Sequence, residues 1–164
     1  MDPVNFTGRE ILEMALEIEE NGMKFYSDAA RAAKNEEVKA LFKTLAEEEG
    51  QHIRIFSDMK KLVGDEFTGE GFDPYITEAS QYLRSMADTE VFTNPDEGAR
   101  AALELTDAAE VLDYAIGMEK DSILFYYEFV KVILEKDRPV LENLIEQEKI
   151  HLGKLTEMKS ALKG

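Results

Sequence analysis

Cysteine is absent from the 164-residue sequence, and no apolar run approaches the 18 residues that indicate a membrane-spanning helix. Without cysteine the chain cannot form disulfides, iron–sulfur clusters or rubredoxin-type iron sites, and it has no thiol nucleophile. The opening residues also lack the basic and apolar segments of a signal peptide. We therefore expect a cytoplasmic, soluble protein.

Positive charge is scarce as well. The 19 Lys and Arg residues are outnumbered by 35 Asp and Glu residues, which gives a net charge of −16. A chain this acidic is repelled by nucleic acids and anionic lipids, so we expect no nucleic-acid partner and no membrane partner. The same excess of carboxylates suits a cation site. The length and the 44 % hydrophobic content favour one globular domain over residues 1–164.

Four long segments show the periodicity of amphipathic helices, whereas the alternation typical of strands is scarce. The first segment is expected to begin at a capping box, Thr7–Glu10, and the second directly after an N-cap, Asn35. The third spans about 107–135, and the fourth begins near Pro139, a residue suited to the first turn of a helix. The predicted fold class is all-α, with the four helices packed as a bundle.

The two halves of the sequence resemble each other. A shift of 100 positions places the first helical segment on the third, so that Leu12, Ala15, Glu19, Phe25 and Tyr26 match Leu112, Ala115, Glu119, Phe125 and Tyr126. A shift of 99 positions places the second on the fourth, so that Leu45, Glu47, Glu49, His52, Met59 and Lys60 match Leu144, Glu146, Glu148, His151, Met158 and Lys159. We therefore predict two related helical hairpins, over residues 8–63 and 107–163.

The connection between the hairpins, residues 64–106, is too long for a tight turn. Its glycine-rich start is loop-like, whereas Asp73–Pro74 is expected to open a short helix to about residue 86, and Asn94–Pro95 a second one. With so long a crossover, we expect each helix of the second hairpin to run parallel to its counterpart in the first.

Each helical segment carries one glutamate among its inward-facing apolar positions. The two histidines of the chain each follow one of these glutamates by three residues, so each Glu-x-x-His pair lies on one face of its helix. With a rise of about 1.5 Å per residue, all six side chains are expected at one level of the bundle. These residues are Glu19, Glu49, His52, Glu119, Glu148 and His151.

The charge of this cluster points to metal ions. Four ionised carboxylates in a dry core would repel one another and lose their hydration. Two divalent cations balance the four negative charges and leave the imidazoles as neutral nitrogen ligands, and a carboxylate-rich site of this kind suits iron or manganese. The alternative is a bundle in which the Glu-x-x-His pairs are merely solvated.

Neighbouring acidic residues are weaker ligand candidates. Glu20 and Glu48 adjoin the chosen glutamates, but their counterparts in the other half cannot replace a carboxylate ligand, because they are Lys120 and Gln147. Three further glutamates lie off the apolar faces and are expected to face solvent, namely Glu17, Glu47 and Glu146.

Two tyrosines, Tyr26 and Tyr126, follow the glutamates of the first and third helices by seven residues, which is two turns along the same face. Each phenol either hydrogen-bonds a ligand carboxylate across the bundle or is a core aromatic whose hydroxyl finds another acceptor. Small residues, Gly22 and Ser122, follow the same glutamates by one turn. They either leave room for a bridging ligand or a small oxidant, or allow close helix packing.

With these residues, the sequence resembles the rubrerythrin-like branch of the ferritin-like di-iron carboxylate proteins. The resemblance covers both hairpins and rests on Glu19 with Tyr26, Glu49-Gly50-Gln51-His52, Glu119 with Tyr126, and Glu148-Lys149-Ile150-His151. It implies a ferritin-like four-helix bundle that holds two iron ions, with manganese or a mixed pair as alternatives. In this family pattern Glu49 and Glu148 bridge the ions, and Glu19 and Glu119 are terminal ligands.

The resemblance also implies an activity, the reduction of hydrogen peroxide to water in the cytoplasm of anaerobes or microaerophiles. We hypothesise a di-iron redox protein that reacts with hydrogen peroxide or dioxygen and takes electrons from an external donor, rubredoxin or a similar protein. We expect a homodimer. The residues assigned to catalysis are Glu19, Glu49, Glu119, Glu148, Tyr26 and Tyr126.

Two features depart from the family pattern. Rubrerythrin proper carries a rubredoxin domain, which a chain without cysteine cannot contain. Rubrerythrins also have an additional glutamate, which takes part in redox-linked iron movement, where this sequence has Ser122. Two other functions therefore stay open. One is a ferroxidase that handles iron for storage or delivery, and the other is a non-catalytic bundle that metal only staples together.

Overall fold

The computed structural model describes residues 8–62, 78, 81–83, 85, 95–105 and 107–164, and these contain helices and short connections but no strand. The expected capping residue Thr7 and the expected helix start at Asp73–Pro74 lie outside the described residues. Residues 78, 81–83 and 85, within the range of that expected crossover helix, are helical. None of the described helices combines the length and apolarity needed to cross a membrane.

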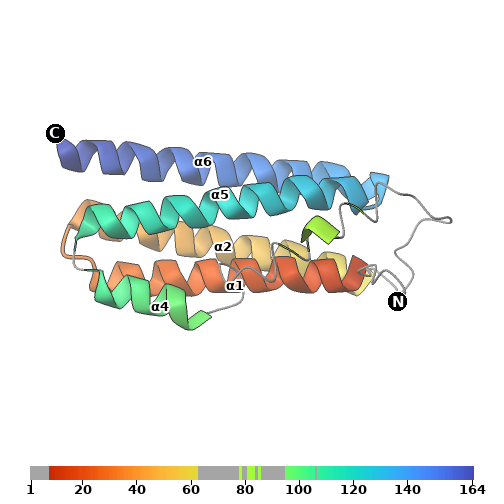
Figure 1. Ribbon diagram of the computed structural model, residues 1–164, viewed down its shortest axis with the longest axis horizontal. Helices are drawn as coiled ribbons and strands as arrows, with labels where there is room; N and C mark the ends of the chain where they lie inside the picture. The colour runs from red at the N-terminus through yellow and green to blue at the C-terminus, as the bar shows by residue number, and fades with distance from the viewer. Residues whose placement is uncertain (1–7, 63–77, 79–80, 84, 86–94, 106) are drawn as a thin grey trace.

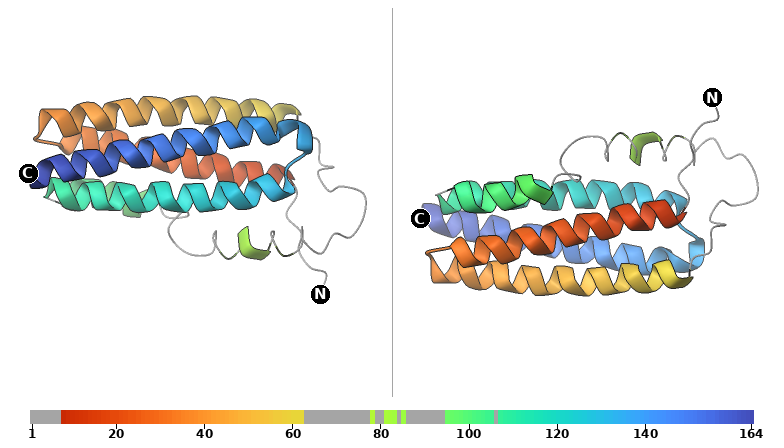
Figure 2. Two further views of the ribbon diagram at one scale, coloured as in Figure 1. Left: turned by 90° about the horizontal axis from the view of Figure 1, so that it is seen from above. Right: turned by 90° about the horizontal axis from the view of Figure 1, so that it is seen from below.

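Four long helices form the bundle: α1 (Gly8–Ala32), α2 (Glu36–Leu62), α5 (Ala108–Val132) and α6 (Arg138–Lys163). Helices α1 and α2 make one hairpin and α5 and α6 the other, and the two hairpins lie side by side (Figures 1 and 2). A short helix, α4 (Pro95–Glu104), packs along α1 near the turn into α2 (Figure 1). The all-α class, the two hairpins and the crossover helix at Asn94–Pro95 are confirmed.

Two of the long helices, α2 and α6, begin where the sequence predicts. Oδ1 of Asn35 accepts hydrogen bonds from the backbone N–H groups of Glu37 and Val38, at 2.9 and 3.0 Å, and so caps α2. Pro139 occupies the first turn of α6. Helix α5 ends at Val132, earlier than expected, because Ile133 has extended backbone angles (φ −73°, ψ 153°). A short 3₁₀ turn, η1 (Glu135–Asp137), leads from there into α6.

The direction of the second hairpin differs from the expectation. Helix α5 runs opposite to α1, and α6 runs opposite to α2 (Figure 1). The core agrees, because Ile133 beyond the end of α5 lies in one apolar cluster with Ile11 at the start of α1. Val111 at the start of α5 packs in another cluster with Val38 at the start of α2. The prediction of parallel counterparts was wrong: α5 is parallel to α2, and is therefore antiparallel to α1, the hairpin partner of α2.

Two apolar clusters fill the two halves of the bundle's length. One includes Ile11, Leu12, Phe56, Phe129 and Leu141, and the other includes Ala30, Val38, Phe42, Val111 and Leu155. The predicted ligands lie between these clusters, near the middle of each long helix. A side chain at the middle of a helix keeps its height along the bundle when the direction of the helix is reversed. The antiparallel orientation of α5 relative to α1 therefore leaves the six ligands at one level.

Candidate metal centre

The structure brings the six predicted ligands together at the centre of the bundle. Helices α1 and α5 contribute one glutamate each, and α2 and α6 each contribute a glutamate and a histidine. Every one of these side chains is at most 4 % exposed. Carboxylates at this depth lose their hydration and need a compensating partner. The residues are Glu19, Glu49, His52, Glu119, Glu148 and His151.

These side chains form two overlapping groups in which all ligand atoms lie within 4.8 Å of one another. Site A consists of Glu19, Glu49, His52 and Glu148. Site B consists of Glu49, Glu119, Glu148 and His151. Because Glu49 and Glu148 belong to both groups, the geometry is that of two adjacent cation positions with two shared carboxylates.

Both imidazole rings direct Nδ1 toward the carboxylates. Nδ1 of His52 lies 2.9 Å from Oε1 of Glu148 and 3.2 Å from Oε2 of Glu19. Nδ1 of His151 lies 3.1 Å from Oε2 of Glu148 and 3.4 Å from Oε1 of Glu49. The two rings stack with centroids 5.5 Å apart. Each ring thus offers one nitrogen to the centre, and its other nitrogen points away.

The outer nitrogens contact residues that the sequence analysis set aside as ligands. Nε2 of His52 donates a hydrogen bond to Oε1 of Gln147 at 2.8 Å. Nε2 of His151 lies 2.9 Å from Oε2 of Glu48, and Lys154 donates to both oxygens of that carboxylate at 3.0 Å. Sequence reasoning missed these contacts. Their signal is that each residue directly precedes a shared glutamate, one position round the helix.

The tyrosines cross between the two halves. The hydroxyl of Tyr26 donates to Oε1 of Glu119, and the hydroxyl of Tyr126 donates to Oε1 of Glu19. Both tyrosines are buried. The sequence left open whether each phenol bonds a carboxylate of the cluster or another acceptor. In the structure, both phenols bond a carboxylate of the cluster across the bundle.

The buried carboxyl groups differ in acidity. Burial raises the pKa of Glu19 and of Glu119 well above the usual range, and the nearby charges of Glu49 and Glu148 raise it further. Burial also acts to raise the pKa of Glu49 and Glu148, but close contacts within the cluster, including those with the histidines, outweigh it and lower both values. In the metal-free protein the shared glutamates therefore carry the negative charge.

The histidines respond to the same carboxylates. Burial acts to lower the pKa of His151, but the nearby carboxylates of Glu119, Glu148 and Glu49 outweigh it and raise the pKa to about 12. The pKa of His52 is raised for the same reason. Two imidazolium groups thus hold the carboxylates together when no metal is bound.

The donor atoms fit a pair of divalent cations. Among the described residues, two buried side-chain atoms have no hydrogen-bond partner, Oε1 of Glu148 and Nδ1 of His151, and both face the centre of the cluster. Four carboxylates and two imidazoles form an oxygen-rich donor set that suits iron or manganese. Two divalent cations would balance four ionised carboxylates and displace the protons from both rings.

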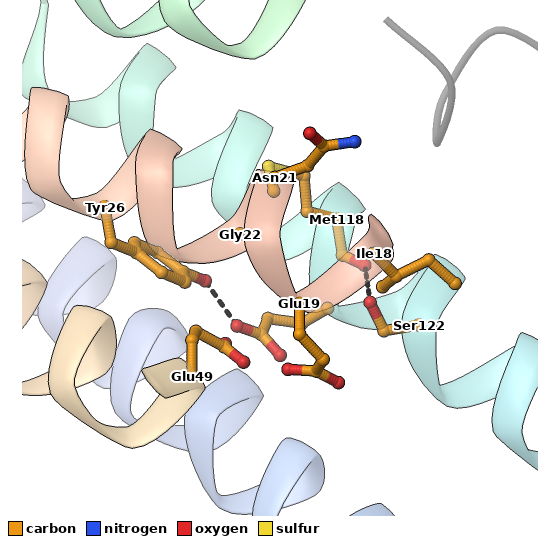
Figure 3. Close-up of a pocket in the computed structure, with 9 residues that line it drawn as sticks. Ile18, Glu19, Asn21, Gly22, Tyr26, Glu49, Met118 and Ser122 are labelled. Atoms are coloured by element: carbon orange, nitrogen blue, oxygen red, sulfur yellow. Dashed lines mark hydrogen bonds between the residues drawn. The ribbon is translucent and has the colours of Figure 1, made fainter. Parts of the chain in front are cut away.

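A small cavity adjoins the cluster between α1 and α5 (Figure 3). Its volume is about 20 Å³, and its lining includes Glu19, Glu49 and Glu119 together with Gly22, Met118 and Ser122. A Cβ atom on Gly22 would lie 3.6 Å from Cδ of Glu49. The hydroxyl of Ser122 is turned to its own helix, where it donates to the Met118 carbonyl at 3.1 Å. The cavity has room for about one water-sized molecule.

The solvent-facing glutamates behave as the sequence predicts. Glu17, Glu47 and Glu146 are exposed, and none of them belongs to either site. Among the other neighbours of the cluster, Glu20 is also exposed. For these glutamates the helical pattern predicted exposure correctly.

Comparison with known proteins agrees with this fold and with a carboxylate-rich metal centre. The rubrerythrin family model matches residues 10–159. A crystal structure from Thermotoga maritima, provisionally described as that of a ferritin-like diiron-carboxylate protein, is similar to the chain with a TM-score of 0.72 and 31 % sequence identity. That similarity covers 95 % of this chain and 96 % of the Thermotoga chain. No curated protein matches the sequence.

Proposed function

The chain belongs to the rubrerythrin family of ferritin-like diiron-carboxylate proteins, and we propose that it reduces hydrogen peroxide or dioxygen with electrons from a separate donor. The proposal is carried by the pair of buried sites that share Glu49 and Glu148 beside a cavity of about 20 Å³. A metal pair that serves only to hold helices together has no need of an adjoining cavity.

Each residue of the cluster has a distinct task in this proposal. Glu49 and Glu148 hold both metal positions at once, and the remaining glutamate and histidine of each site complete it. When bound, two iron ions would supply two electrons and Lewis acidity to the oxidant. The reduction of hydrogen peroxide to two water molecules consumes these two electrons and two protons.

The surrounding residues orient the cluster and admit the oxidant. The tyrosine hydroxyls donate to Oε1 of Glu19 and to Oε1 of Glu119 and so fix the orientation of both carboxylates beside the metal positions. Gly22 and Ser122 leave the space in which a small oxidant reaches the carboxylates. The buried apolar clusters on either side exclude bulk water.

The electron donor is proposed to be a second protein, rubredoxin or a similar one. A chain without cysteine cannot hold the iron–sulfur or rubredoxin-type centres that pass electrons to a di-iron site. We also propose a homodimer as the form that acts.

Iron handling is the second candidate, and the net charge of −16 favours it, because an acidic surface attracts Fe²⁺ as a substrate. In this case the protein would oxidise Fe²⁺ and pass on or store the ferric product. Catalytic turnover with a reductant separates the two functions, because a peroxidase consumes oxidant repeatedly without accumulating ferric iron.

The test begins with anaerobic loading by Fe²⁺, followed by measurement of iron per chain. Rapid mixing with hydrogen peroxide, and separately with dioxygen, would follow the near-ultraviolet absorption of an oxidised di-iron centre. We expect two irons per chain, a fast reaction and repeated turnover once a reductant is added. Turnover that depends on added Fe²⁺ instead of the reductant would favour iron handling. Failure to bind iron stoichiometrically would contradict both functions.

A matched pair of variants adds a control. Glu49→Gln removes a shared carboxylate and should abolish loading of the pair. Glu47→Gln makes the same chemical change two residues away at an exposed position and should leave loading and turnover intact.

A further inference from the structure

The metal centre is built from matched residues of the two halves. The shifts that relate the hairpins place each glutamate, histidine and tyrosine of the cluster on an identical residue. The contacts match as well, since each tyrosine crosses to the glutamate of the other half, and each Nδ1 lies within 3.4 Å of both shared glutamates. If nothing else differed, sites A and B would be nearly equivalent.

The residues behind the histidines break this equivalence. Glu48 and Gln147 occupy matching positions, one residue before the shared glutamates, and each reaches across the bundle to Nε2 of the histidine in the other half. One is a carboxylate and the other a neutral amide of the same length. The distances are nearly equal, 2.9 Å to His151 and 2.8 Å to His52, so the difference lies in charge.

We propose that Glu48 and Gln147 are positioning residues whose difference in charge makes the two metal positions unequal, with site B binding a divalent cation more tightly than site A. This inference rests on the metal binding that the proposed function requires. It goes beyond that function in assigning an order of loading and in naming the residues that set the order.

The physical reason lies in the donor strength of the imidazole. A carboxylate beside the outer N–H draws the proton toward itself and increases electron density on the ring, so Nδ1 becomes a stronger ligand. An amide oxygen does this less, because it carries no net charge. Lys154 pairs with Glu48 and brings a positive charge to the same side, so the effect on site B comes through the contact of the carboxylate with the ring N–H and not through the net charge of the pair.

The surroundings of the two residues preserve the difference. Lys154 donates to both oxygens of Glu48 and so fixes the carboxylate, and Oε2 of Glu48 also lies beside Nε2 of His151. Gln147 donates from Nε2 to Oδ1 of Asn143 at 2.6 Å, which directs its Oε1 to His52. Each contact is thus held in one orientation by a further side chain from the same or the facing helix.

The chain offers a direct readout, because it contains two histidines, one in each site. Zn²⁺ is a suitable probe, since it is diamagnetic, binds imidazole nitrogen and requires no redox chemistry. Protein labelled with ¹⁵N-histidine would be titrated with Zn²⁺ and followed by long-range ¹H–¹⁵N correlation NMR. A His52→Gln variant serves only to assign the two sets of signals.

In the unmodified protein we expect the ring signals of His151 to shift before those of His52, with apparent affinities that differ about tenfold or more, the usual effect of partners behind metal ligands. Glu48→Gln should bring the two transitions together by weakening site B. The exchange variant Glu48→Gln with Gln147→Glu should reverse the order, so that His52 responds first. Glu47→Gln, an equal charge change at an exposed neighbour, should leave the order unchanged.

The exchange variant controls for a purely structural effect, because positions 48 and 147 together still carry one carboxylate and one amide. Circular dichroism would verify that its helix content is retained. If both histidines respond together in the unmodified protein, or if the exchange leaves His151 first, the inference is overturned while the metal centre stands. If neither histidine responds to Zn²⁺, the metal centre beneath the proposed function is contradicted as well.

Discussion

The hydroxyl of Tyr126 on α5 donates a hydrogen bond to Oε1 of Glu19 on α1. The matching pair, Tyr26 and Glu119, makes the same contact in the opposite direction. Tyr126 packs in one of the two apolar clusters and Tyr26 in the other, so these hydrogen bonds tie the metal centre to both halves of the core. They also join the two hairpins directly.

Removal of the Tyr126 hydroxyl should destabilise the metal-free protein. In Tyr126→Phe the ring still packs, but Oε1 of Glu19 loses its donor in a buried setting, which costs about 1–3 kcal/mol. Urea unfolding of the metal-free form measures this difference. Tyr127→Phe is the control, because Tyr127 is 45 % exposed and should show a much smaller change. Equal stability of the two variants would mean that the cross-bundle hydrogen bond contributes nothing.

Metal affinity should rise with pH. In the metal-free protein the pKa of His151 is raised to about 12 and that of His52 is also raised, so both rings hold a proton at pH 7. The pKa values of Glu19 and Glu119 are raised as well. A cation must displace these protons, so it competes better when protons are scarce, and its affinity falls as pH is lowered.

Calorimetry at pH 7 in buffers of different ionisation enthalpy counts the displaced protons. We expect about two or more protons released for each pair of Zn²⁺ ions, because both imidazolium groups must become neutral. Binding without proton release, or an affinity that is independent of pH between about 6 and 8, would contradict the charge state assigned to the metal-free cluster.

Gly22 tests whether the cavity admits the oxidant. A Cβ here meets Cδ of Glu49 at 3.6 Å, an ordinary contact, so Gly22→Ala should fit and stabilise α1 by about 0.5–1 kcal/mol. Gly22→Leu instead fills the cavity and should slow oxidation of the iron-loaded protein at least about tenfold, which corresponds to about 1.4 kcal/mol in the barrier.

The matched control for this substitution is Gly117→Leu. Gly117 also lies within a long helix, but a Cβ there has no neighbour within 4 Å, so the same increase in helix propensity occurs away from the cavity. Rapid mixing with hydrogen peroxide compares the variants after equal iron loading. Unchanged oxidation in Gly22→Leu would assign Gly22 to close helix packing instead.

The buried ligands were predictable because they violate a strong pattern. A charged side chain on the apolar face of a helix costs free energy unless a partner compensates it, so its recurrence at matched positions is informative. Glu19 and His52 stand out in this way from their apolar neighbours, and both are buried in the structure. Glu17, off the same face, is exposed.

The remaining features depend on how helices pack, which the pattern of one helix does not contain. Periodicity assigned the apolar faces but not the direction of α5, because an amphipathic face looks alike in either direction. The contact of Glu48 with His151 depends on the register between α2 and α6. Glu48 is only half-buried, and its place directly before a shared glutamate does not say which histidine it reaches.

The resemblance to the rubrerythrins implies a glutamate where this chain has Ser122, and Ser122→Glu tests what that carboxylate would add. Ser122 lines the cavity beside Glu119, so a glutamate here would add a fifth carboxylate next to site B. We expect tighter binding of Fe²⁺ and a higher rate with hydrogen peroxide relative to dioxygen, because the added charge stabilises a more highly charged metal pair.

Ser122→Ala is the control. Its hydroxyl donates only to the Met118 carbonyl of its own helix, so the alanine variant should keep the rates of the unmodified protein. If the glutamate variant and the alanine variant show the same ratio of peroxide rate to dioxygen rate, a carboxylate at position 122 does not set the preference between the two oxidants.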